Sequence, residues 1–227
     1  RTLESLFSHV REQFQMTAAI HALARKPRVL IMVSKHGHCL NDLLFRWRSG
    51  WLPIDIPAIV SNHPDYAELA ASYGIPFHHL PLPTGSSAEV KRAQEQQVEA
   101  LVSEEGIDLV VLARYMQILS AEFCGFLKGR AISIHHSFLP SFKGAKPYYQ
   151  AHDRGVKLIG ATAHYVTADL DEGPIIEQDV ERVDHTHTPE DFTAVGRDVE
   201  CVVLARAVKW HAEHRVLMNG HKTVVFK

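Results

Sequence analysis

The sequence has few cysteines and lacks the features that would place it in a membrane or on nucleic acid. Its three cysteines, Cys39, Cys124 and Cys201, are scattered along 227 residues and form no CxxC pair. This usage is typical of a reducing compartment, and we expect a cytoplasmic protein. No signal peptide is visible in the given sequence, and no apolar run is long enough to cross a bilayer. The formal net charge of -2 provides no basic field that would attract nucleic acid or an anionic membrane.

Metal-binding motifs are also missing, although the sequence contains 16 histidines. None of them lies in an HExxH motif, and only His211 and His214 have a spacing that places both on one helical face. Zinc needs three or four convergent ligands with supporting partners. We therefore expect no metal, although the close histidines leave a structural metal as a minor alternative. These close histidines are His36/His38, His78/His79, His135/His136, His185/His187 and His211/His214.

The composition, with 46% hydrophobic and 22% charged residues, is that of a globular domain with a substantial core. Apolar residues recur at helical spacing from residue 3 to about residue 15, and Lys26-Pro27 follows as a break. We expect residues 1–25 to form a helical arm and residues 26–227 to form the main domain. The chain begins at Arg1 without methionine, so we expect it to be part of a longer product. A lone helix outside the main pattern needs a packing partner, so we expect the arm to be the remnant of an upstream domain or an oligomer contact.

Strands and helices alternate through the first two thirds of the main domain. Residues 28–33 and 107–113 are short continuous apolar runs, as expected of strands buried on both faces. Between them and after them, the pattern predicts further strands and helices. This alternation predicts an α/β fold, with a mostly parallel Rossmann-like sheet and helices on both faces. The further strands are 54–60 and 77–80, and the helices are 39–48, 65–73, a longer helix that Ser87 caps, 120–127 and 146–154.

The helix that follows Ser87 has a clear amphipathic pattern. After Gly160 the alternation of strands and helices ends. Two strands at 161–166 and 175–180 precede a long helix that Thr188-Pro189 opens. Asn219-Gly220 predicts a C-terminal hairpin. In the helix after Ser87 we expect Val90, Val98, Leu101 and Val102 to face inward and Lys91, Arg92 and Glu95 to face outward.

The stretch 132–142, ISIHHSFLPSF, is the strongest candidate for a functional site. Strand geometry sends Ile132 and Ile134 to one face and Ser133 and His135 to the other. The proline at position 140 then ends the strand, because it has no amide proton for a ladder. The alternative interpretation is an ordinary edge strand that is half exposed.

Ligands bind at the carboxyl ends of strands in open parallel sheets, which here brings several loops together. These loops are residues 34–40, residues 114–119 and the acidic loop 167–174. An imidazole at His135 that faces the carboxylate of Asp171 is held in one tautomer and carries a proton or a charge. Such a pair suits attack on a carbonyl, with Ser133 as a further donor. The alternatives are a solvated carboxylate for Asp171, as for Asp169 and Glu172, and a packed core histidine for His136.

Two separate segments, 133–142 and 169–176, resemble the folate-dependent formyltransferase superfamily, and the resemblance runs from about Arg28 to the C-terminus. The resemblance implies a formyltransferase-type fold and an arm that is the end of an N-terminal regulatory ACT domain. It also implies an Asn, a His and an Asp around the formyl group, which fall on Ser133, His135 and Asp171. Serine in place of asparagine is a departure, because a hydroxyl is shorter and offers one proton rather than two.

The resemblance further implies a folate pocket built from two loops. Met116, Gln117, Ile118 and Leu119 would line the pterin, and Thr167, Ala168, Asp169 and Leu170 would close the other side. The alternative for Met116, Ile118 and Leu119 is ordinary core packing, with Met116 as a filler.

Two features resemble the hydrolase branch of the superfamily rather than its transferase branch. The loop 34–40 is bulkier than the phosphate-binding loop of the transferases, although Lys35 remains a candidate anion ligand, and His136 stands where the transferases usually have proline. We expect a homo-oligomeric enzyme that hydrolyses 10-formyltetrahydrofolate to formate and tetrahydrofolate, without a permanently bound cofactor. The alternatives are formyl transfer to an amine such as glycinamide ribonucleotide, and a folate-binding sensor that lost turnover through Ser133.

Overall fold

A computed structural model describes residues 2–22, 24–140 and 147–227. A seven-stranded sheet has the order β3-β2-β1-β4-β5-β6-β7. The first five of these strands pair in parallel, and β5-β6 and β6-β7 pair antiparallel. The predicted α/β fold with a mostly parallel sheet is therefore confirmed. The strands are β1 (Arg28–Val33), β2 (Asp55–Ser61), β3 (Phe77–His79), β4 (Leu109–Leu112), β5 (Ala131–His135), β6 (Leu158–Tyr165) and β7 (Ile175–Arg182).

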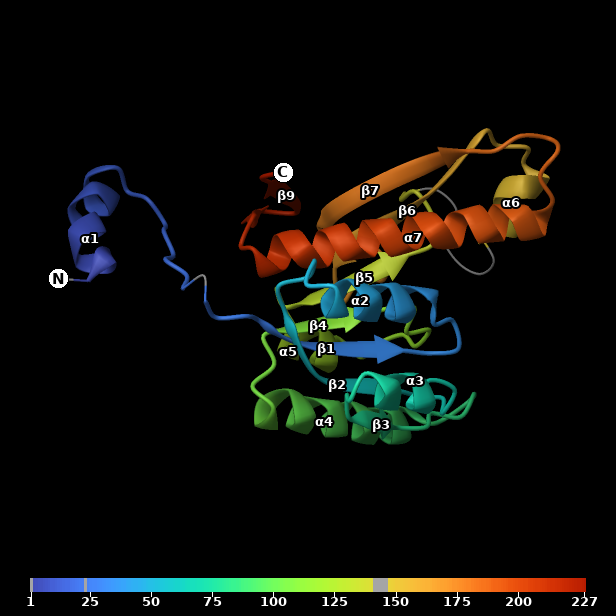
Figure 1. Cartoon of the computed structure of the whole chain (residues 1–227), viewed down its shortest axis with the longest axis horizontal. Coiled ribbons are helices and arrows are strands. Elements are labelled where there is room, and N and C mark those ends of the chain that lie inside the picture. Colours follow the sequence, from blue (N-terminus) through green and yellow to red (C-terminus); the bar gives the residue numbers. More distant parts are fainter. Residues whose placement is uncertain (1, 23, 141–146) are drawn as a thin grey trace.

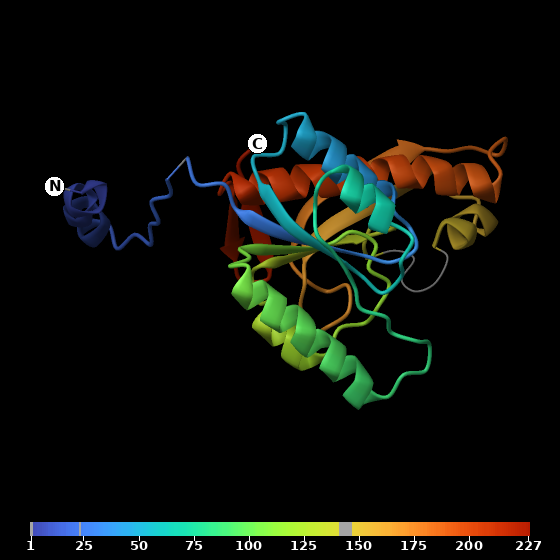
Figure 2. The same cartoon turned by 60° about the horizontal axis from the view of Figure 1, so that its bottom comes forward.

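Helices cover both faces of the sheet, as Figure 2 shows. One face packs against α2 (His38–Arg48), α3 (Ala67–Ser72) and α7 (Pro189–Ala212). The other face packs against α4 (Ala88–Glu104) and α5 (Ala121–Phe126). Alternate residues of β1 supply both cores, with Ile31 in the first and Leu30 in the second. This burial on both faces explains why the sequence of β1 is a continuous apolar run.

Side-chain caps begin the helices where the sequence predicts them. Ser87 and Ser120 accept hydrogen bonds from backbone amides three residues later, at the starts of α4 and α5. Thr188 and Asp191 form a capping box at the start of α7, with Pro189 in the first turn. These local signals need no tertiary context.

Two assignments along α4 are wrong. Val90 is 49% exposed rather than buried. Glu95 is only 2% exposed, and its carboxylate accepts hydrogen bonds from both the amide and the hydroxyl of Ser120 at the start of α5. A partner distant in sequence therefore overrides the helical pattern at Glu95, because a buried carboxylate is tolerated when it is hydrogen-bonded.

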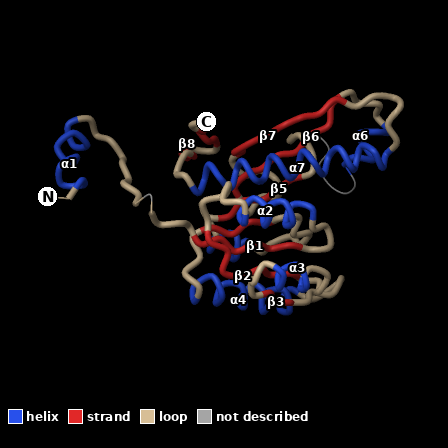
Figure 3. The backbone as a smooth tube through the Cα atoms, viewed as in Figure 1, coloured by secondary structure: helices blue, strands red, loops and turns tan. Residues whose placement is uncertain are grey.

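The antiparallel end of the sheet carries the C-terminal elements (Figure 3). α6 (Pro147–Asp153) packs against α7, and the predicted C-terminal hairpin consists of β8 (Val216–Asn219) and β9 (Lys222–Val225). Ser141 and Phe142 of the candidate stretch, and Lys146 at the predicted start of α6, lie outside the described residues.

The arm begins with α1 (Leu3–Gln13), none of whose residues is buried. Leu3, Leu6 and Phe14 are 69%, 58% and 65% exposed, and α1 stands apart from the sheet in Figure 1. Farther along, His21 stacks on His214 and Arg25 forms an ion pair with Asp108, which attaches the end of the arm to the main domain. The helices of the described segments are all too short or too polar to cross a membrane.

Gly173 lets the acidic loop cross closely over β6. A Cβ atom at this position would overlap the backbone carbonyl oxygen of Tyr165, which no side-chain movement can relieve. Gly125 in α5, in contrast, has open space around a Cβ. The close approach at Gly173 therefore fixes the loop that carries Asp171.

We expect Gly173→Ala to lower the free energy of unfolding by about 1–3 kcal/mol, as overpacking does. The matched control Gly125→Ala should raise it by up to about 1 kcal/mol, because alanine favours a helix over glycine. Urea denaturation measures both. Equal stabilities for the two variants would contradict the close approach.

Candidate active site

The end of β5 presents polar side chains to a pocket, as the alternation predicts. Ile132 and Ile134 are buried in the core, and Ser133 and His135 line the pocket, which Ile134 also touches. Ser133 lies opposite His164 in the antiparallel ladder with β6. The edge-strand alternative is wrong, because β5 has a partner on each side and His135 is 6% exposed.

The structure brings His135 and Asp171 together, although they are far apart in the sequence. The Nδ1 atom of His135 lies 3.2 Å from Oδ1 of Asp171. Asp171 has a φ of 58°, a left-handed conformation that a non-glycine residue adopts at a cost in energy. The solvated-carboxylate alternative for Asp171 is wrong, because its side chain is only 17% exposed.

The charges and hydrogen bonds around the pair determine where its shared proton lies. Burial raises the pKa of Asp171, but the hydrogen bond with His135 and the charges of His135 and His164 outweigh it and leave the pKa below its ordinary value. Asp171 is therefore a carboxylate, and His135 Nδ1 carries the proton between them. The Nε2 atom of His135 is buried without a hydrogen-bond partner among the described residues. This nitrogen is free to meet a substrate.

His164 is a member of the site that the sequence reasoning missed. Its Nδ1 lies 2.9 Å from the carbonyl oxygen of Tyr165, and its Nε2 lies 3.8 Å from Oδ1 of Asp171. Burial lowers the pKa of His164, against the opposing effects of the Tyr165 carbonyl and the Asp171 carboxylate. The signal in the sequence was a polar residue in the strand paired with β5, but identifying it required the register of that pairing.

A pocket of 340 Å³ lies beside the His135–Asp171 pair. Met116 and Ile118 are 52% and 64% exposed despite their apolar side chains, and Leu170 is 60% exposed. The core-packing alternative is therefore wrong for Met116 and Ile118, and exposed apolar groups in a concave site are typical of ligand binding. The lining includes the predicted residues Met116, Gln117, Ile118, Leu119, Ser133, His135, His136, Thr167, Ala168, Asp169, Leu170 and Asp171.

A small hydrogen-bond network positions the loop that carries Met116. The hydroxyl of Ser34, at the end of β1, accepts from the amide of Met116 at 3.0 Å. The same hydroxyl donates to Oδ1 of Asn62, which follows β2, at 2.7 Å. Three neighbouring strand ends of the parallel sheet are thus joined behind the pocket.

Of the two residues predicted to distinguish the hydrolase branch from the transferase branch, His136 lines the pocket and Lys35 does not. Lys35 is exposed and is absent from the described lining of the pocket, and its carbonyl oxygen accepts from the hydroxyl of Tyr66 at 2.6 Å. His136 is partly buried and lines the pocket, with its ring edge to face with Tyr148 at 6.2 Å between centroids. Burial, followed by the charge of Arg114, lowers the pKa of His136 to about 3.

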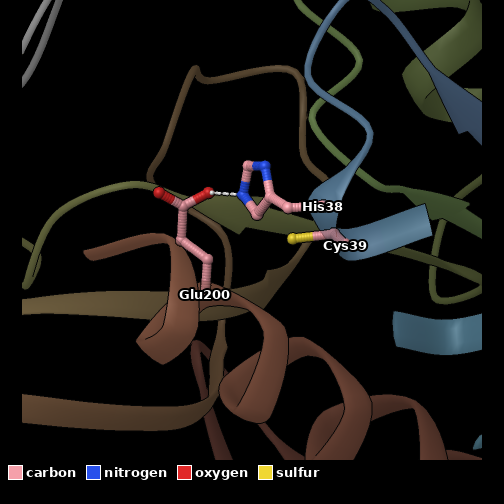
Figure 4. A group of neighbouring side chains, drawn as sticks. All are labelled: His38, Cys39 and Glu200. Carbon is pink, nitrogen blue, oxygen red and sulfur yellow. Dashed lines mark hydrogen bonds and ion pairs between the residues drawn. The ribbon is translucent and has the colours of Figure 1, made fainter. Parts of the chain in front are cut away.

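Glu200 of α7 is the centre of a second buried cluster (Figure 4). Its carboxylate bonds Nε2 of His38 at 2.8 Å and accepts from the hydroxyl of Tyr148 at 2.6 Å. Nε of Arg114 lies 3.5 Å away. Burial raises the pKa of Glu200, but His38, Arg114 and Tyr148 outweigh it, so the pKa lies below its ordinary value.

His38, Cys39 and Glu200 place three potential metal ligands within 4.8 Å of one another. The surrounding chemistry opposes a divalent ion. Burial, with contributions from Cys201 and Glu200, raises the pKa of the Cys39 thiol, whereas a metal needs the thiolate. The guanidinium of Arg114 already supplies positive charge beside Glu200. The donor set therefore fits a hydrogen-bonded ion network better than a metal centre.

Comparison with known proteins agrees with this geometry. Residues 27–208 match the model of the formyl transferase family, and the chain belongs to that family. Within it, the chain is 54% identical over 225 residues to a formyltetrahydrofolate deformylase from Corynebacterium sp. (strain P-1), covering 99% of the chain and 77% of the relative.

Solved structures give the same picture. A formyltetrahydrofolate deformylase from Burkholderia mallei has 61% identity and a TM-score of 0.91, covering 99% of this chain and 79% of that one. A glycinamide ribonucleotide transformylase from Symbiobacterium toebii has 28% identity and a TM-score of 0.83, covering 93% and 99%. The higher identity lies with the deformylases, as the sequence resemblance implies.

The depressed pKa of His136 makes a prediction about stability. In the unfolded chain the imidazole of His136 binds a proton with a pKa near 6.5, whereas in the folded chain its pKa is about 3. Stability is therefore lost as the pH falls below 6.5. Between pH 7 and pH 5, His136→Gln should lose about 2 kcal/mol less free energy of unfolding than the wild type does. Urea denaturation at both pH values checks this, and parallel losses would contradict the buried neutral imidazole.

Proposed function

We propose that this chain hydrolyses 10-formyltetrahydrofolate to formate and tetrahydrofolate. The observation that carries the proposal is the convergence of the His135 imidazole and the Asp171 carboxylate beside a pocket with exposed apolar walls. The high identity to formyltetrahydrofolate deformylases supports the hydrolase over the transferase. The substrate is the folate itself, and the proposal needs no resident cofactor.

The chemistry follows from the orientation of the pair. Asp171 holds the proton on Nδ1 of His135, so Nε2 faces the substrate. A water positioned by the carboxylate attacks the formyl carbon, and negative charge develops on the formyl oxygen. The free Nε2 of His135 takes a proton from the water as it attacks, and the resulting imidazolium stabilises that oxygen and passes the same proton to the leaving N10 nitrogen as the carbon–nitrogen bond breaks. The other product is formic acid, which releases its remaining proton to solvent as formate, and tetrahydrofolate leaves with its N10 proton.

The other predicted residues bind and orient the substrate. Met116, Ile118 and Leu119 cover the faces of the pterin, while backbone groups around Gln117 read its edge. Residues 167–170 close the opposite wall. Ser133 contributes one hydroxyl donor beside His135, on the strand that also carries it.

The arm serves an interaction in this proposal. α1 has several exposed apolar residues and none that is buried in the described chain, which fits packing against a regulatory ACT domain or a second copy of the chain. A homo-oligomer in the cytoplasm agrees with this interpretation, and sedimentation of the purified protein measures the oligomeric state.

We expect His135→Ala to lower the turnover number for formate release by about 10²–10⁴, because proton transfer and oxyanion stabilisation are both removed. His185→Ala, which changes an exposed histidine in a turn, is the matched control and should keep the wild-type rate. The assay is formate release from 10-formyltetrahydrofolate, with and without an amine acceptor. An unchanged rate in His135→Ala removes the imidazole from the mechanism, and formyl transfer in place of formate release identifies a transferase.

Ser133→Asn should increase the turnover number, by up to about 10²–10³, because the amide restores a longer donor with two protons. Steady-state kinetics of formate release measure the change. A near-zero wild-type rate that this substitution raises greatly would identify the natural chain as a folate-binding sensor. A rate that falls would show that the hydroxyl is already the better donor.

A further inference from the structure

Arg114 is held in a buried position that the proposed mechanism does not use. It follows β4 with a φ of 63°, in the left-handed region where a non-glycine residue is strained. Its side chain is 9% exposed. Strain at a buried, charged residue indicates that the position of its guanidinium is under functional constraint.

The guanidinium of Arg114 keeps unpaired donors. Its Nε lies 3.5 Å from Glu200, beyond good hydrogen-bond distance, and both Nε and Nη1 are buried without a hydrogen-bond partner among the described residues. At this separation Glu200 does not satisfy them, and its two oxygens already bond His38 and Tyr148. A buried donor without an acceptor is costly, so this site favours an acceptor from solution.

Arg114 lines a second pocket, of 570 Å³, which adjoins the folate pocket. Met116 and His136 line both pockets and form the wall between them. The second pocket is also lined by His36, Arg197 and the carboxylates of Glu190 and Glu200.

The described lining of the second pocket holds two guanidiniums, Arg114 and Arg197, and two carboxylates, Glu190 and Glu200. Burial lowers the pKa of His36, and the charges of Arg114 and Arg197 lower it further against the opposing charge of Glu200. Among the pocket carboxylates, Glu200 accepts from Tyr148 and Glu190 from Tyr149, so each already has a donor of its own. Arg114, in contrast, has two buried nitrogens without a hydrogen-bond partner among the described residues.

We propose that Arg114 binds a small carboxylate in this second pocket, and that its ligand is the formate released by the reaction. This inference rests on the proposed function. Tetrahydrofolate still fills the pocket at Met116 and Ile118 after the carbon–nitrogen bond breaks, so formate leaves through the adjoining space. A planar guanidinium matches the two oxygens of a carboxylate, and the hydrogen bonds are charge-assisted.

The test is a titration of the full chain with ¹³C-formate, followed by NMR line broadening, which needs no turnover. Arg114→Gly removes the guanidinium and suits the left-handed backbone, so the variant should fold, and thermal unfolding confirms this. Arg114→Lys keeps the charge but loses the planar fork. We expect formate affinity to fall by about 10–100-fold in Arg114→Gly and less in Arg114→Lys.

Parallel titrations with acetate and phosphate identify the ligand class. Tighter binding of formate than of either ion supports the proposal, and tighter binding of phosphate overturns the carboxylate assignment. Product inhibition by formate should weaken in Arg114→Gly to the same extent as binding. Equal formate affinity in the wild type and Arg114→Gly overturns the site, even if formate release is intact. If the wild-type chain binds formate but does not hydrolyse 10-formyltetrahydrofolate, the proposed function is refuted and the anion site is still supported.

Discussion

The contact between His135 and Asp171 is the interaction on which the rest of the site depends. A carboxylate 3.2 Å from Nδ1 fixes the imidazole tautomer and directs the other nitrogen into the pocket. The fold brings the two groups together by different means. His135 ends a strand in the middle of the sheet, whereas Asp171 lies in a strained loop that Gly173 presses against β6. His164, from the neighbouring strand, adds to the field around the same carboxylate.

The two pockets meet at His136, which lines both, but their other lining residues give them different chemistry. The folate pocket has exposed apolar walls and one charged pair at its base. The second pocket has a buried guanidinium supported by Glu200, and this cluster ties α2 and α6 to α7. One wall thus separates a region suited to a flat aromatic ligand from a region suited to a small anion. That division matches a reaction that splits one substrate into tetrahydrofolate, which carries a flat pterin ring, and a one-carbon acid.

The parts of this structure that local patterns determine were predictable from the sequence. The buried run of β1, the caps Ser87 and Ser120, and the alternation along β5 each depend on residues near one another in the chain. The pairing of His135 with Asp171 also came from the sequence, but there the resemblance to a known family supplied the link.

Residues whose environment comes from distant segments were missed or misassigned. Glu95 is buried because Ser120 of another helix bonds it, and nothing within α4 indicates this. His164 required the β5–β6 register, and Arg114 required both a left-handed backbone and a partner on α7. Lys35 was predicted from the charge of its loop, but the side chain does not reach the described pocket lining.

A double-mutant cycle on formate release tests the central claim most directly. If His135 and Asp171 act as one unit, the double variant His135→Ala/Asp171→Asn loses little more activity than the more damaging single variant. Losses that multiply across the two substitutions would mean that the imidazole and the carboxylate act independently, which contradicts a site built on their contact.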